Sequence, residues 1–192
     1  PCAEGRAALC EPGAKANGAG TLLTGGMRWS LSGTKPYHHL GVSGFAEATV
    51  VSARSAVKID RDLKPEIAAL FGCAVMTGMG AVVNTAGVRP GQSVAVFGLG
   101  GVGLSAVLGA VAAGAYPIVA IDRVPEKLAL AKSLGASHTV LADANTVEAV
   151  REATNGGAHV TVETVGHEAV LVQAYQATRR GGLTVTAGLP HP

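Results

Sequence analysis

Short apolar runs alternate with longer segments of helical length over the second half of the chain. The runs have the length of buried strands and lie at residues 94–97, 118–121, 138–141, 159–163 and 183–187. The segments between them cover about residues 102–113, 125–134, 146–153 and 168–178. Strict alternation of strand and helix predicts a parallel sheet with helices on both faces. We therefore expect an α/β fold with a doubly wound parallel sheet.

The first half of the chain has a different pattern. Residues 1–35 combine small residues, glycines and scattered charges, which is typical of loops. Residues 45–52 and 56–59 favour β structure and predict two short strands. The apolar stretch at about residues 65–86 predicts two helices that are separated at Gly72.

A glycine cluster lies between the first strand and the first helix of the α/β part. It reads Gly98-Leu99-Gly100-Gly101-Val102-Gly103, and Asp122 follows about 20 residues later at the end of the second apolar run. Gly98 allows a tight turn, Gly100 lets a pyrophosphate approach the backbone, and Gly103 lets the helix pack closely. The N–H groups of Gly101–Gly103 would face the phosphates at the positive end of the helix. This order and spacing predict a dinucleotide site.

The residues at the end of the second run indicate which dinucleotide is bound. Asp122 can accept hydrogen bonds from both ribose hydroxyls of the adenosine half, and its charge would repel a 2′-phosphate. Arg123 beside it acts in the opposite direction, because a guanidinium can accommodate that phosphate. We expect NAD, with NADP left open. The alternative is an ordinary glycine-rich turn that binds no ligand.

Composition narrows the class of protein. Hydrophobic residues make up 48% of the 192 residues and charged residues 15%, so much of the chain must be buried. The net charge of +2 gives no reason to expect a nucleic acid or a membrane as partner. Three cysteines are too few for a disulfide scaffold, which favours a reducing, cytoplasmic compartment. The chain starts without Met and carries five of the six strands of a dinucleotide fold, which indicates an internal fragment of a longer protein.

Several stretches taken together resemble one family. They are the pair Cys2-x7-Cys10, the excursion that ends in HHLGVSGFAEATVV, and CAVMTGMGAVVNTAGVRPGQSVAVFGLGGVG. As a set they resemble the zinc-dependent medium-chain alcohol dehydrogenases, and the long excursion at 24–40 resembles the liver-type and glutathione-dependent formaldehyde dehydrogenase branch. The resemblance implies that residues 1–74 are the C-terminal part of a GroES-like, β-rich catalytic domain with a remnant of a structural-zinc lobe. Residues 75–192 would then be an incomplete Rossmann domain that binds NAD.

The resemblance also implies site residues. Cys73 would be a ligand of the catalytic Zn²⁺, and Cys2 and Cys10 would be ligands of a structural Zn²⁺. Thr77 would pack against the nicotinamide ring, and Lys127 would join Asp122 and Arg123 at the adenosine ribose. The other implied cofactor contacts come from the glycine cluster, Gly98 to Gly103, at the pyrophosphate. Two backbone segments would flank the nicotinamide ring, one of Thr164, Val165 and Gly166 and one of Ala187, Gly188 and Leu189.

The implied activity is hydride transfer between an alcohol, or a hydroxymethyl-thiol adduct, and NAD. Zinc would act as a Lewis acid that favours the alkoxide, and C4 of the nicotinamide would receive the hydride. The other catalytic zinc ligands and the proton relay would precede this chain, so we expect the fragment alone to be inactive and the full-length protein to be a homodimer or homotetramer. A polyol dehydrogenase, a zinc-free medium-chain quinone reductase and a non-catalytic NAD-binding module remain alternatives.

Overall fold

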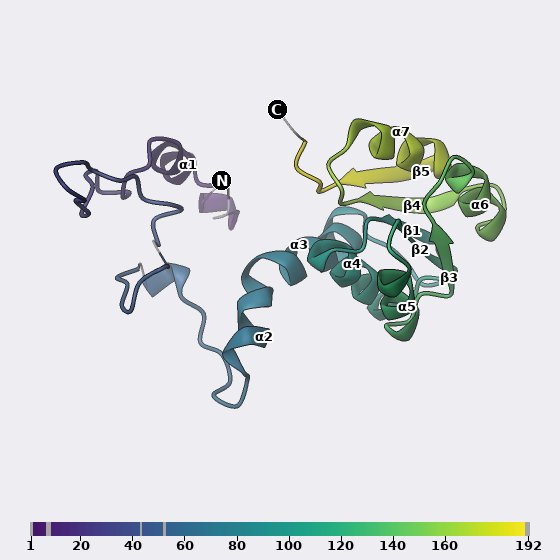
Figure 1. The fold of residues 1–192 in the computed structure, drawn as a ribbon, viewed down its shortest axis with the longest axis horizontal. Helices are drawn as coiled ribbons and strands as arrows, with labels where there is room; N and C mark the ends of the chain where they lie inside the picture. The colour runs from purple at the N-terminus through teal and green to yellow at the C-terminus, as the bar shows by residue number, and fades with distance from the viewer. Residues whose placement is uncertain (1, 7–8, 43, 52, 191–192) are drawn as a thin grey trace. The chain divides into compact units, whose positions relative to one another are not determined.

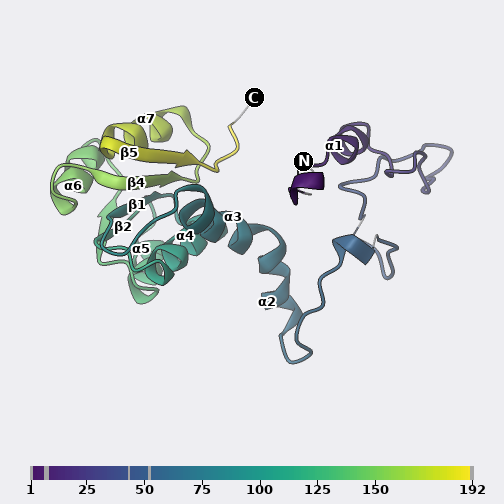
Figure 2. The ribbon, with the colours of Figure 1, turned by 180° about the vertical axis from the view of Figure 1, so that it is seen from behind.

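The computed structural model describes residues 2–6, 9–42, 44–51 and 53–190. The chain divides into two compact units, Pro1–Asp60 and Arg61–Pro192, which are drawn from opposite sides in Figures 1 and 2. This division falls earlier than the boundary between residues 74 and 75 that the sequence suggests.

The first unit contains little regular structure. Its elements are the 3₁₀ helix η1 (Cys2–Glu4), the helix α1 (Glu11–Gly18) and the 3₁₀ helix η3 (Ala53–Ser55). An isolated bridge joins Leu31 to Thr34, and the described residues of this unit form no strand. The strands predicted at 45–52 and 56–59 are therefore wrong for the described residues of those ranges. An alternating run becomes a strand only when a neighbour pairs with it, and the apolar side chains in these runs are largely exposed.

A single long helix runs from Pro65 to Thr85. It is built from α2 (Pro65–Leu70), η4 (Phe71–Val75), α3 (Met76–Gly80) and η5 (Ala81–Thr85), of which η4 and η5 are π-helical. The predicted break at Gly72 is wrong, because the π-helical turn of η4 carries that glycine without ending the helix. Among the described residues this helix alone has the length and apolarity that a bilayer span requires. A core helix of a soluble protein passes the same test, so this finding assigns no membrane role.

The second unit is built on a parallel sheet, as predicted. Its strands are β1 (Val94–Phe97), β2 (Ile118–Asp122), β3 (His138–Leu141), β4 (Ala158–Glu163) and β5 (Thr178–Thr186). They lie in the order β3-β2-β1-β4-β5, and all four pairs are parallel. The order reverses at β1, because the chain first adds strands on one side of β1 and then crosses to the other side.

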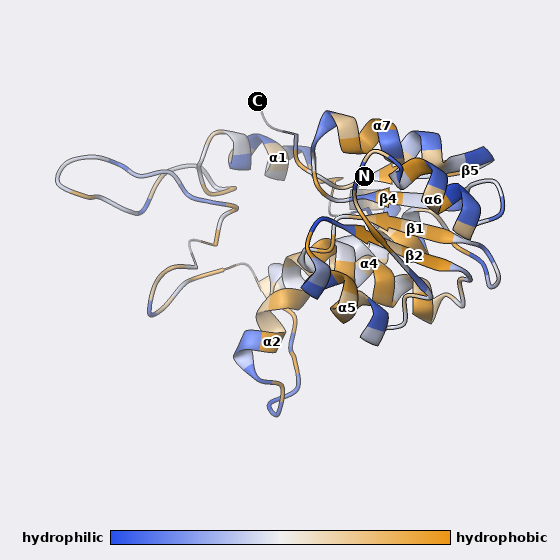
Figure 3. Ribbon diagram, turned by 45° about the vertical axis from the view of Figure 1, so that its right-hand side comes forward, coloured by the Kyte–Doolittle hydropathy of each residue, from blue (hydrophilic) through white to orange (hydrophobic). Residues whose placement is uncertain are grey.

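Helices cover both faces of this sheet. They are α4 (Gly101–Ala112), α5 (Pro125–Ser133), α6 (Thr146–Ala153) and α7 (Glu168–Ala177). Val94 and Val96 of β1 pack in one core cluster with side chains of α4 and α5, whereas Ala95 and Phe97 pack in the other with side chains of α6 and α7. The apolar strands between the two helical layers stand out in Figure 3. The doubly wound α/β architecture is therefore confirmed.

This topology places a crevice at the carboxyl edge of the sheet. The helices that follow β1 and β4, α4 and α7, pack on opposite faces, so the chain diverges beyond the paired strand ends where the strand order reverses. In open α/β sheets this switch point is where ligands bind. The glycine cluster follows β1, and Thr164 follows β4, so both lie at this edge.

Candidate functional site

The glycine turn between β1 and α4 needs glycine at two positions for steric reasons. Gly98 has a φ of +87°, and a Cβ there would lie 2.6 Å from Cγ2 of Val165. A Cβ on Gly103 would overlap the carbonyl oxygen of Gly98. Gly98 therefore turns the chain, and Gly103 lets the first turn of α4 lie directly on that turn.

Gly100 is different, because a Cβ there would meet open space. No atom lies within 4 Å of the position that this Cβ would take, and Gly100 is the N-cap of α4 with φ −76° and ψ −169°. The space in front of the turn is therefore available to a ligand. The N–H groups of Gly101, Val102 and Gly103 belong to the first helical turn, where the backbone has no intrahelical acceptor and attracts anions.

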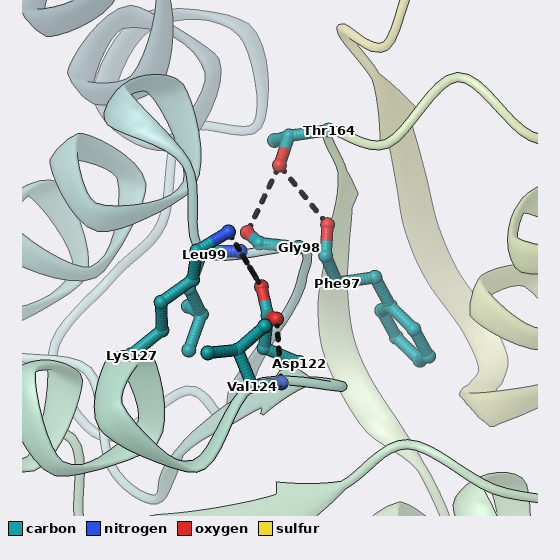
Figure 4. Close-up of polar contacts among 7 residues, drawn as sticks. All are labelled: Phe97, Gly98, Leu99, Asp122, Val124, Lys127 and Thr164. Carbon is teal, nitrogen blue, oxygen red and sulfur yellow. Dashed lines mark hydrogen bonds and ion pairs between the residues drawn. The ribbon is translucent and has the colours of Figure 1, made fainter.

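Asp122 is held beside this turn (Figure 4). Its Oδ2 accepts a hydrogen bond from the Leu99 N–H at 2.7 Å, and its Oδ1 accepts one from the Val124 N–H at 3.0 Å. The ammonium of Lys127 lies 3.8 Å from Oδ2. The Asp122 side chain is only 10% exposed, whereas that of Lys127 is 45% exposed. The carboxylate is thus fixed in place next to the open side of the glycine turn.

Thr164 joins the end of β4 to the glycine turn. Its hydroxyl lies 3.0 Å from the carbonyl oxygens of both Phe97 and Gly98 and donates to this pair (Figure 4). The backbone N–H of Thr164 also donates to the Phe97 carbonyl, at 2.9 Å. The two strand ends at the switch point are therefore tied together at their carboxyl edge.

A cleft of about 630 Å³ opens along this edge. Its wall brings together eight of the cofactor residues expected from the sequence, Gly98, Leu99, Gly100, Asp122, Arg123, Lys127, Thr164 and Val165. The cleft has room for a nucleotide, since ligand pockets usually measure a few hundred Å³. The glycine turn lies at one side of this cleft and the carboxylate of Asp122 at another.

The cleft wall also contains polar residues that the sequence analysis did not assign. They are Asp143, His167 and Gln173. His167 accepts a hydrogen bond from the Ala169 N–H at 3.2 Å and so caps α7, while Gln173 Nε2 lies 3.5 Å from the carbonyl oxygen of Asp143. Asp143 and His167 follow the ends of β3 and β4, so the rule that places parallel strand ends at one edge was the signal that pointed to them.

A second, smaller hollow of about 500 Å³ lies between the long helix and the end of β5. Its wall includes Thr77 of α3, together with Thr186 and Ala187 at the end of β5. The structure therefore brings together two residues, Thr77 and Ala187, that the family resemblance places on the same ring. Thr77 is partly buried and is presented by a helix that carries π-helical turns on both sides.

The loops after β4 and β5 meet at the remaining expected cofactor residues. Gly166 has a φ of +81°, and a Cβ on it would overlap the carbonyl oxygen of Leu189. A Cβ on Gly188 would overlap the backbone nitrogen of Gly166. Backbone therefore packs against backbone here, while the Leu189 side chain is exposed.

The described residues do not form a zinc site by themselves. Cys73 lies in η4 with its side chain exposed, and no group of three or more His, Cys, Asp or Glu side chains is found in the described ranges. Cys10 caps α1, where its Sγ accepts a hydrogen bond from the Gly13 N–H at 3.4 Å. The side chain of Cys2 lies outside the described part. Zinc needs four ligands as a structural ion and three as a catalytic one, so both zinc assignments stay predictions.

The fold and the residues at the carboxyl edge of the sheet define the class of protein. A parallel sheet with reversal at β1, a glycine turn that opens a helix, and an acid held at the end of β2 are the features of nucleotide-binding α/β proteins. Residues 101–192 match the family model described as zinc-binding dehydrogenase. With the relatives described next, this match shows that the chain belongs to the zinc-dependent medium-chain alcohol dehydrogenase family.

The relatives are named as S-(hydroxymethyl)glutathione dehydrogenases and alcohol dehydrogenases. S-(hydroxymethyl)glutathione dehydrogenase of Synechocystis sp. is 41% identical over 98% of this chain and 52% of its own length. Alcohol dehydrogenase class-3 of Myxine glutinosa is 37% identical, over 98% of this chain and 51% of its own length. The chain thus spans about half the length of the curated relatives it matches.

Solved structures agree with this assignment. The alcohol dehydrogenase zinc-binding domain protein from Burkholderia ambifaria matches with a TM-score of 0.89 and 37% identity, over 98% of this chain and 52% of that one. Benzyl alcohol dehydrogenase from Acinetobacter calcoaceticus matches with a TM-score of 0.74 and 36% identity, over 80% of this chain and 42% of that one.

Proposed function

We propose that this chain is the coenzyme-binding portion of an NAD-dependent, zinc-dependent alcohol dehydrogenase. The observation that carries the proposal is the pairing of an open glycine turn with a fixed acid. Gly100 leaves room in front of the helix end, and the Leu99 N–H holds the Asp122 carboxylate beside it, both in the wall of the 630 Å³ cleft. The names of the relatives support the dehydrogenase activity.

The roles of the residues follow from this geometry. The first N–H groups of α4 would bind the pyrophosphate, since they carry the positive end of the helix dipole. Asp122 would accept hydrogen bonds from the adenosine ribose, and Lys127 would help to orient that carboxylate. Thr77 and Ala187 would orient the nicotinamide in the smaller hollow. NAD, when bound, supplies the acceptor of the hydride.

Zinc enters the proposal only at the level of the whole protein. Cys73 offers one thiolate, which suits Zn²⁺, but one ligand does not make a site among the described residues. The other ligands would come from sequence beyond this chain. The full-length protein would act in the cytoplasm, as a homodimer or homotetramer, on an alcohol or a hydroxymethyl-thiol adduct such as the name of the Synechocystis relative describes.

Titration calorimetry of the purified chain with NAD and with NADP tests the proposal. We expect NAD to bind and to bind more tightly than NADP. Gly100→Val should weaken NAD about tenfold or more, because its side chain enters the space in front of the turn, where a Cβ has open space around it. Gly72→Ala is the matched control, since its new Cβ also meets open space but lies outside the cleft wall. Absence of NAD binding, or equal binding by Gly100→Val, would contradict the proposal.

A further inference from the structure

Glu163 is the only buried carboxylate among the described residues. It is 1% exposed and is the last residue of β4, directly before Thr164. A buried acid is costly unless its oxygens are hydrogen-bonded, so its partners show what it is for.

Its carboxylate is satisfied by groups from two different loops. Oε1 accepts hydrogen bonds from the N–H groups of Val165 at 2.6 Å and Gly166 at 2.7 Å. Oε2 accepts one from the hydroxyl of Thr186 at 2.8 Å. All three partners donate, which suits an ionised carboxylate, because it only accepts. One side chain thus holds the loop after β4 with one oxygen and the end of β5 with the other.

The main chain strengthens this connection. The carbonyl oxygen of Glu163 accepts hydrogen bonds from the N–H groups of Ala187 at 2.8 Å and Gly188 at 3.2 Å. A Cβ on Gly188 would lie 2.8 Å from Oε2 of Glu163, and one on Gly166 would overlap the carbonyl oxygen of Leu189. The two loops are therefore packed against each other with no space for a different arrangement around the carboxylate.

The two loops belong to different hollows. Val165 lines the larger cleft, whereas Thr186 and Ala187 line the smaller hollow beside Thr77. Glu163 lines neither hollow, yet it is bonded to the walls of both. Removing its side chain would leave the two walls joined by main-chain hydrogen bonds alone, so that each wall could move more independently of the other.

We propose that Glu163 is a positioning residue that holds the two hollows in one arrangement, so that a single dinucleotide fits across both. The carboxylate does not touch the ligand; it sets the backbone that does. This inference rests on the proposed NAD function for its ligand, but the coupling of the two loops is a property of the chain itself.

Three variants separate coupling from charge and from general stability. Glu163→Ala leaves all three donors without an acceptor. Glu163→Gln keeps the shape, since the amide oxygen can accept both N–H groups and the amide nitrogen can donate to Thr186. Thr186→Val removes only the hydrogen bond toward β5 and leaves those toward Val165 and Gly166 in place.

Amide hydrogen exchange of the free chain measures the coupling without any ligand. We expect the N–H groups of Val165 and Gly166 to exchange about tenfold faster in Glu163→Ala, since each loses its acceptor and one such hydrogen bond is worth about that factor. The N–H groups of Ala187 and Gly188 keep the main-chain carbonyl of residue 163 as acceptor, so their exchange should accelerate less, as the loop after β5 loosens. Glu163→Gln should match the wild type. Thr186→Val should accelerate exchange at 187 and 188 only. Unchanged exchange of both loops in Glu163→Ala would overturn the inference.

Binding of NAD and of ADP measures the consequence. ADP needs only the larger cleft, whereas NAD would span both hollows. Glu163→Ala and Thr186→Val should weaken the affinity for NAD about tenfold and change the affinity for ADP less than about threefold. Glu163→Gln should bind NAD as the wild type does. Equal weakening of both ligands would overturn the coupling and leave the NAD function standing. If the wild type binds neither ligand, the proposed function fails, and the exchange experiment still decides on Glu163. If Glu163→Ala does not fold, Thr186→Val carries both tests.

Discussion

Backbone hydrogen bonds orient the Asp122 carboxylate for its proposed contact with the ribose. Its two oxygens accept hydrogen bonds from the backbone after β1, at Leu99, and from the backbone after β2, at Val124. Each carboxylate oxygen has a second acceptor site, so these bonds orient the group without exhausting it. An acid that was free to rotate would lose entropy on binding a ribose, whereas this one is already in position.

Asp122→Asn tests the role of that charge. The amide keeps an acceptor oxygen but no longer repels a 2′-phosphate, so the preference for NAD over NADP should fall by about tenfold or more. Titration of both dinucleotides measures this ratio. Glu126→Gln is the control, because it removes the same charge from an exposed position near the start of α5 that does not line the cleft. A ratio that stays at the wild-type value would remove Asp122 from the ribose site.

His159 makes a prediction about pH at the opposite edge of the sheet. Burial lowers the pKa of His159 below its ordinary value of 6.5, and the nearby Arg179 charge lowers it further. The imidazole lies 2.8 Å from the Ser93 hydroxyl and 2.6 Å from a guanidinium nitrogen of Arg179. The unfolded chain takes up this proton first as the pH falls. The contribution of neutral His159 to the free energy of unfolding should therefore be fully present above pH 6.5 and should decrease below it.

Urea unfolding of the wild type and of His159→Gln at several pH values between 8 and about 5 checks this expectation. The variant should lose less stability than the wild type over this range, because it lacks the neutral histidine that acid must protonate. The other histidines stay in both proteins and cancel in the comparison. Parallel profiles for the two proteins would show that His159 does not contribute.

Single residues differ in how far the sequence revealed them. The expected reasons for Gly98 and Gly103 agree with the geometry, since each glycine fills a standard position in a strand–turn–helix pattern that is local in sequence. Glu163 was not recognised, because its importance comes from Thr186, which lies 23 residues further along the chain. A bond between distant segments leaves no periodic signal.

At the scale of elements, the contact between α3 and α4 packs the long helix against the sheet domain. Gly78 is buried where the two helices meet, and a Cβ on it would overlap the carbonyl oxygen of Val102 and lie 2.7 Å from the Ala106 nitrogen. The helices can approach this closely only because Gly78 has no side chain. The same contact places Thr77 beside the smaller hollow.

Gly78→Ala should destabilise the chain by about 1–3 kcal/mol, because the added methyl group forces two backbones apart. Gly80→Ala on the same helix is the matched control. Its new Cβ would meet nothing nearer than the Asn84 side chain at 3.9 Å, so it should be neutral or gain up to about 1 kcal/mol from helix propensity. Denaturant unfolding of both variants measures the difference. Equal stability of the two would contradict the close contact.

Elements were predictable where a local pattern of apolar residues and turn residues marks them. The helices and the first four strands of the sheet domain appear close to the expected places, because apolar runs bounded by glycine and proline leave few alternatives. The last strand is an exception, because β5 begins at Thr178, five residues before the expected start at 183. The strands expected around residues 45 and 56 do not form, since a strand also depends on a partner that lies elsewhere. The helix break expected at Gly72 failed because a π-helical turn was not considered.

At the scale of the whole molecule, the two units differ in how much hydrophobic core each of them contains. Both hydrophobic core clusters lie between residues 81 and 185, and the buried hydrophobic side chains of the described chain all belong to the second unit. The residues that line the larger cleft and the smaller hollow also lie in that unit. We therefore assign both the cooperative stability and the proposed ligand binding to residues 61–192.

This difference leads to a prediction about truncation. A chain of residues 61–192 should unfold in one cooperative transition and bind NAD within about threefold of the whole chain, because a core and a complete cleft are both retained. A peptide of residues 1–60 should show no cooperative transition, because its described residues contribute no buried hydrophobic side chain and no strand. Circular dichroism during heating and calorimetry with NAD measure both. Loss of NAD binding in the truncated chain, with its fold intact, would mean that the first unit contributes to the dinucleotide site.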